Sequence, residues 1–90
     1  MSLAIGALVV SSTGSDKGRV LAVTGISDSY LILADGRKRR LEKPKQKKEK
    51  HVKLLDKSLS DKAVDLLRQG AMTNKLLYRS IRQSLEDGNI

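Results

Sequence analysis

The chain has 90 residues, one histidine, no cysteine and a formal net charge of +8, and its length limits it to one hydrophobic core. Without cysteine it can form neither a disulfide framework nor a zinc knuckle, and His51 alone cannot hold a metal ion, so we expect no metal and no cofactor. No apolar run approaches the roughly 20 residues that cross a bilayer, and residues 1–10 lack the basic start of a signal peptide, so we expect a soluble, cytoplasmic protein.

The first half of the chain has the pattern of short β-strands. Runs rich in Val, Leu and Ile, closed by Gly, Ser, Asp or Thr, predict three strands over residues 5–10, 19–25 and 29–34. Asp35-Gly36 predicts a type I′ hairpin turn, because this dipeptide tolerates positive φ at both central positions. A fourth strand should therefore cover residues 37–41, and residues 51–55 are a candidate fifth strand.

A lysine-rich segment follows, and then two helices. Residues 43–50 contain one proline and no large apolar residue, which predicts an exposed, mobile loop. Apolar residues at helical spacing predict helices over residues 60–69 and 73–87. The candidate N-caps are Ser58 or Ser60 and Thr73, and the candidate C-caps are Gly70 and Gly88.

These elements define a fold class and a division of the chain. Several predicted strands are apolar on both faces, so we expect the helices to cover the second face. The expected architecture is mainly β with C-terminal helices: a small twisted barrel in residues 1–55, followed by a helical extension in residues 56–90.

The positive charge is concentrated in one segment. Residues 37–53 hold ten of the eighteen Lys and Arg against Glu42 and Glu49, which leaves +8 there and zero over the rest of the chain. A solvated charge run would also be lysine-rich, but a ten-to-two imbalance confined to one segment favours a polyanion-binding surface.

Two stretches of the sequence resemble a known family. Residues 6–23 alternate hydrophobic and hydrophilic residues around Gly18, as in the KOW motif, and residues 30–45 add Asp-Gly, a basic cluster and Glu-x-Pro before a lysine run and His51. This order is similar to the large-subunit ribosomal proteins of the fourteen-e type and their small bacterial relatives. The resemblance covers residues 5–55 and implies an SH3-like (KOW) β-barrel that binds ribosomal RNA, with Gly18 at the turn entering the second strand. Residues 56–90 do not match that family, and their helices are candidates for a protein partner.

The expected RNA contacts combine charge with this resemblance. Arginines on a strand should position phosphates with their planar forks and should contribute more per charge than the lysines. With only Tyr30 and Tyr78 as aromatics, and Tyr30 expected in the core or at its rim, recognition should use phosphates, 2′-hydroxyls and RNA shape. The predicted RNA-binding residues are Lys17, Arg19, Arg37, Lys38, Arg39, Arg40, Lys43, Lys45, Lys47, Lys48, Lys50, His51 and Lys53.

Other functions have less support in the sequence. His51 has no plausible Ser or Asp relay and residues 14–18 lack P-loop spacing, so we expect neither an enzyme nor a small-molecule substrate. The alternative is a protein-interaction module that uses the barrel and the C-terminal helices, although no aromatic-lined groove for proline-rich peptides is evident. Membrane attraction ranks last, because no basic helix carries Trp or Phe anchors. We predict an RNA-binding protein associated with the ribosome.

Overall fold

The computed structural model describes residues 3–86 of the chain. Its strands are β1 (Ala7–Ser11), β2 (Val20–Ser27), β3 (Tyr30–Ala34), β4 (Lys45–Lys48) and β5 (Val52–Ser58), and its helices are α1 (Asp61–Arg68) and α2 (Asn74–Glu86). Two 3₁₀ turns, η1 (Gly14–Asp16) and η2 (Glu49–His51), lie in the connections. The prediction of short strands followed by two helices is confirmed. Neither helix has the length and apolar character needed to cross a membrane.

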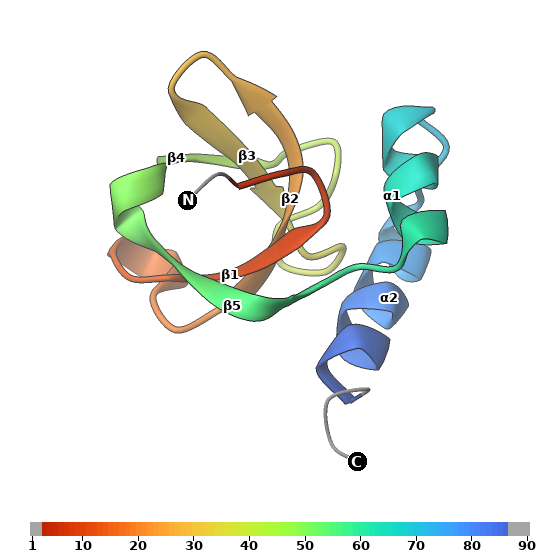
Figure 1. Cartoon of the computed structure of the whole chain (residues 1–90). Coiled ribbons are helices and arrows are strands. Elements are labelled where there is room, and N and C mark those ends of the chain that lie inside the picture. The colour runs from red at the N-terminus through yellow and green to blue at the C-terminus, as the bar shows by residue number, and fades with distance from the viewer. Residues whose placement is uncertain (1–2, 87–90) are drawn as a thin grey trace.

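The five strands form one antiparallel sheet that curls into a barrel-like shape. The strand order is β4-β3-β2-β1-β5, so that β4 and β5 are the two edge strands. In the chain, the edge strands β4 and β5 are connected only by η2. The sheet must therefore curl to bring its two edges together (Figure 1). A register shift between Val23 and Gly25 in β2 contributes to the bend, because a bulge increases local twist.

Apolar side chains fill both faces of this curled sheet. Successive residues of a strand point to opposite faces, so Val9 lies inside the barrel while Leu8 lies outside. The inner cluster consists of Val9, Leu21, Val23, Leu31 and Leu33. The outer cluster joins Leu8, Ala22 and Ala34 of the sheet to Leu59, Ala63, Leu77 and Ile81 of the C-terminal part. The helices therefore cover the second apolar face, as predicted, and Figure 1 shows them on one side of the barrel.

The helix ends follow the predicted capping residues. Ser60 Oγ accepts a hydrogen bond from the Ala63 nitrogen at 3.2 Å, and Thr73 Oγ1 accepts one from the Leu76 nitrogen at 3.2 Å. After α1, Gly70 has a φ of 71° and its nitrogen donates to the Leu67 carbonyl, as in an αL C-cap. Ser60, Thr73 and Gly70 are thus confirmed as caps, while Gly88 lies outside the described residues.

The prediction of a mobile loop over residues 43–50 is wrong. Residues 45–48 form β4, which pairs with β3 so that Lys48 faces Tyr30 and Lys45 faces Leu33. Backbone hydrogen bonds to a neighbouring strand need no apolar side chains, and lysines are common on exposed edge strands because they discourage further pairing. The lysines of β4 are therefore held on an ordered backbone.

The predictions of a type I′ hairpin at Asp35-Gly36 and of a strand over residues 37–41 are also wrong. Gly36 has a φ of 83°, but Asp35 is not among the residues with positive φ. The Asp35 side chain instead accepts hydrogen bonds from the nitrogens of Arg37 and Arg39, at 2.9 and 2.8 Å. A side chain that caps nearby backbone groups competes with strand pairing. Residues 36–43 are consequently a sequence of turns, which we call the basic turn.

Candidate nucleic-acid interface

A group of basic side chains lies where β4 meets η2, with Lys48 and Lys50 exposed and Lys45 and His51 half-buried. Lys45, Lys48, Lys50 and His51 surround a shallow, open depression, and we call these four residues the lysine face. β4 carries the first two, η2 carries the others, and pairing with β3 fixes the backbone beneath them. Lys53 is exposed on the adjoining strand β5. The arrangement offers several ammonium groups to a polyanion on one ordered surface.

Tyr30 belongs to the same depression and was not in the predicted set. Its side chain is 39% exposed, at the rim of the barrel, and Lys48 Nζ lies 5.8 Å from the centre of its ring. The strand pattern contained a signal for this, since the buried Leu31 and Leu33 place Tyr30 on the outward side. One exposed ring can stack on a base or a sugar, but it does not form a platform for several bases.

Two of the predicted arginines form ion pairs with buried carboxylates. Asp16 is only 3% exposed. Arg39 Nε donates to both of its carboxylate oxygens, at 3.1 and 3.0 Å, and Arg39 Nη2 lies 2.9 Å from Oδ2 in the same ion pair. Arg19 adds a weaker pair, with its Nε 3.6 Å from Asp16 and its Nη1 3.8 Å from Asp35. The Arg39 guanidinium, chiefly through its hydrogen bonds, lowers the pKa of Asp16. These arginines therefore tie the basic turn to the β1–β2 connection.

Asp16→Asn is expected to lower the free energy of unfolding by about 2 kcal/mol at pH 7, because it removes the counter-charge of Arg39 inside the protein. A lowered pKa in the folded state stabilises the protein above the unfolded pKa of about 3.9, and this contribution is lost as pH falls through the folded pKa. The difference in free energy of unfolding between the variant and the wild type should thus become smaller below about pH 4. Urea unfolding between pH 7 and pH 3 measures this difference, with Asp56→Asn at an exposed position as the control. A difference in free energy of unfolding that does not change with pH would contradict the ion-pair account.

Arg40 and Arg37 make other contacts. Arg40 Nε donates to Glu42 Oε2 at 2.7 Å, and Asn74 Nδ2 donates to Glu42 Oε1 at 2.8 Å. These two hydrogen bonds, that from Arg40 above all, lower the pKa of Glu42 to about 2. Arg37 stacks on Tyr78 of α2, with its guanidinium carbon 4.4 Å from the ring centre. Arg40 is thus neutralised locally, whereas Arg37 is turned toward the helix.

Lys47 also serves the fold. It is 7% exposed, and its Nζ donates to the Thr13 carbonyl at 2.6 Å and to Thr13 Oγ1 at 3.1 Å. The remaining predicted lysines form no ion pair within residues 3–86: Lys17, Lys38, Lys43, Lys48, Lys50 and Lys53 are exposed, and Lys45 is half-buried and contributes to the lowered pKa of Asp16. Apart from Arg37, the free positive charge of the predicted site is therefore carried by lysines.

Gly18 has the positive φ that its position suggested, at 86°. Its nitrogen donates to the Ser11 carbonyl at 2.8 Å, and a Cβ at this position would meet nothing within 4 Å. The glycine is thus required for the backbone conformation and not for a close approach. The turn leaves Lys17 exposed and directs Arg19 toward the carboxylates of Asp16 and Asp35.

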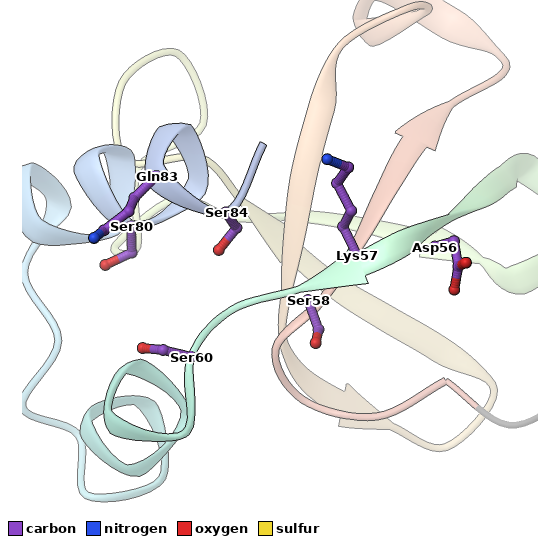
Figure 2. Close-up of a pocket in the computed structure, with 7 residues that line it drawn as sticks. All are labelled: Asp56, Lys57, Ser58, Ser60, Ser80, Gln83 and Ser84. Carbon is purple, nitrogen blue, oxygen red and sulfur yellow. The ribbon is translucent and has the colours of Figure 1, made fainter. Parts of the chain in front are cut away.

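A second hollow lies between β5 and α2, as Figure 2 shows. Four serines line it with Gln83, Asp56 and Lys57, and the hydroxyls of Ser80 and Ser84 project from α2. Lys57 is its one cation, and Lys57 Nζ donates to the Leu85 carbonyl at 3.0 Å. This hollow lacks the free charge of the lysine face. In the described part of the chain, no three His, Asp or Glu side chains could hold a metal ion together.

The lysine face can bind phosphates, because the ammonium groups of Lys48 and Lys50 are exposed and form no ion pair within the described residues. It holds no arranged acid, base and nucleophile. The chain matches no protein-family model and no curated protein.

Proposed function

We propose that the protein binds structured RNA through phosphate contacts made by the lysine face and Lys53. The observation that carries the proposal is how the predicted RNA-binding residues are partnered: Arg19, Arg39 and Arg40 are paired with carboxylates, whereas the exposed lysines are not. Glu49 of η2 is the only acidic residue between Lys45 and Lys53. Ammonium groups without internal partners release counterions from nucleic acid when they bind its phosphates.

The mode of recognition follows from the chemistry of these side chains. An ammonium is a point charge on a flexible stem, so it attracts phosphate without reading the sequence. Tyr30 adds one ring at the edge of the depression. We therefore expect recognition of folded RNA by its backbone and shape, with little selection of unpaired bases.

The fold supports a more specific form of the proposal. A small five-stranded antiparallel barrel whose edge strands are joined by one 3₁₀ turn is consistent with the SH3-like (KOW) barrel that the sequence resemblance implies. Gly18, at the KOW glycine position, precedes β2 and has the backbone conformation of a turn. In this form, the RNA is ribosomal RNA and the protein is a ribosome-associated, cytoplasmic, non-enzymatic factor.

The alternative of a protein-interaction module has less support. The apolar residues of the helices that would form a docking face, Leu77 and Ile81 of α2 and Ala63 of α1, are buried against the sheet. In the described part of the chain, the exposed large hydrophobic residues, Ile26, Tyr30, Leu54 and Leu76, come from four different elements. The exposed lysines without ion-pair partners are the stronger feature.

Sedimentation of the endogenous protein through sucrose gradients tests the proposed function. At low salt the protein should travel with ribosomal particles, and at high salt it should remain near the top, because phosphate contacts weaken steeply with ionic strength. Ribonuclease treatment at low salt is the control and should also release it. Sedimentation at the top of the gradient under both salt conditions would contradict ribosome association.

A further inference from the structure

A second cationic cluster lies at the junction of the basic turn and α2, away from the lysine face. Arg37 of the turn and Arg82 of α2 both lie over the ring of Tyr78, with guanidinium carbons 4.4 and 5.8 Å from its centre. Their Nη1 atoms both donate to the Tyr78 hydroxyl, at 3.2 and 3.4 Å. Because both bonds meet at one oxygen, no more than 6.6 Å can separate the two nitrogens.

This convergence leaves positive charge without an internal counter-charge. Neither Arg37 nor Arg82 forms an ion pair with any residue from 3 to 86. The nearby Asp35 is engaged by two backbone nitrogens of the basic turn and by Arg19. A neutral phenol oxygen accepts both hydrogen bonds but cannot offset two like charges.

The cluster is also open to a ligand. Arg37 and Tyr78 line a shallow hollow together with Arg19, Lys38 and Asp35, and Arg37, Lys38 and Arg82 are exposed. A phosphate oxygen accepts a guanidinium N–H at about 2.8 Å, so one phosphate can reach both arginines at the separation that Tyr78 imposes. Tyr78 holds the two forks in place before a ligand arrives, which lowers the entropy lost on binding.

We propose that Arg37 and Arg82, held by Tyr78, form a phosphate-binding site, and that α2 is thereby part of the RNA-binding surface. The inference rests on the proposed function in its choice of RNA as the source of the phosphate. It adds residues that the sequence pattern missed, because Tyr78 and Arg82 lie 41 or more positions from Arg37 and outside the basic segment. The C-terminal helices then serve RNA binding as well as the outer core.

The test compares Arg82→Gln with Arg68→Gln in binding one structured RNA at fixed salt. Each variant removes one exposed arginine charge from a helix, and Arg68 lies on α1. Arg82→Gln should weaken RNA binding about tenfold and reduce the slope of log K against log salt by about one. Arg68→Gln should change affinity by about twofold or less, as a distant charge does. Equal losses from the two variants would overturn the site.

A second measurement separates failure of this site from failure of the proposed function. Inorganic phosphate is titrated into the full chain while the side-chain resonances of Tyr78 and the arginines are followed by NMR. The site predicts saturable shifts in the wild type that Arg82→Gln abolishes and Arg68→Gln retains. If the wild type bound no RNA, the proposed function would fail and this titration alone would decide the site; absence of saturable shifts would then overturn it.

Discussion

Gly36→Ala is expected to lower the free energy of unfolding by about 4 kcal/mol, far more than the same substitution at Gly18. Both glycines have nearly the same φ, 83° and 86°, so each alanine suffers a left-handed strain of about 1–2 kcal/mol. At Gly36 the new Cβ would also collide with the Asn74 carbonyl oxygen and lie 3.0 Å from the Tyr78 nitrogen. Displacing the backbone of α2 adds about 1–3 kcal/mol.

Comparing Gly36→Ala with Gly18→Ala separates the effect of the close contact with α2 from the effect of the left-handed backbone conformation. At Gly18 a Cβ would meet nothing within 4 Å, so Gly18→Ala should cost only the strain. Urea unfolding of both variants, followed by circular dichroism, measures the difference. Equal destabilisation would show that the basic turn does not need its close contact with α2, and that Arg37 is not positioned against Tyr78 in this way.

Lys48→Gln combined with Lys50→Gln is expected to weaken binding to structured RNA about 50-fold at 0.1 M salt. Both lysines belong to the lysine face and are exposed, and neither has an ion-pair partner in the described chain. Counterion release contributes a factor of about eight for each phosphate contact at this salt concentration, and two contacts multiply. Filter binding or fluorescence anisotropy with one folded RNA gives both affinities.

A charge-matched control distinguishes a defined surface from a diffuse polycation. Lys62→Gln with Arg68→Gln also removes two positive charges, from exposed positions on α1. This pair should weaken binding by about threefold or less, since charges beyond a Debye length of about 10 Å act weakly. Losses of equal size in the two double variants would mean that RNA responds to net charge alone.

The expectation that arginines contribute more to RNA binding per charge than lysines does not follow from the structure of the site. It depended on a strand over residues 37–41, which the Asp35 side chain replaces with a turn. It also assumed free guanidinium groups, whereas Arg39 is bound to a buried aspartate 23 positions earlier in the chain. A carboxylate that far away gives no local signal, so the sequence could not separate structural arginines from exposed lysines.

The helices and the first three strands could be predicted because their signals are local. Leu77 and Ile81 recur at helical spacing, and Ser60 and Gly70 bound the first helix through contacts within a few residues. β4 could not be found this way, because residues 45–48 contain no apolar residue and pair with β3 only through the backbone. The need for glycine at position 36 could not be predicted either, because its close contact with Asn74 exists only in the folded chain.

The salt dependence of RNA binding tests the central claim, that unpaired lysines hold RNA by its phosphates, most directly. Affinity for one structured RNA is measured from 0.05 to 0.3 M salt for the wild type and for the Lys48→Gln, Lys50→Gln variant. With about four to six phosphates engaged, the slope of log K against log salt should be roughly −3 to −5 in the wild type, and its magnitude should fall by about two in the variant. A flat wild-type response, or the same slope in both proteins, would contradict the account.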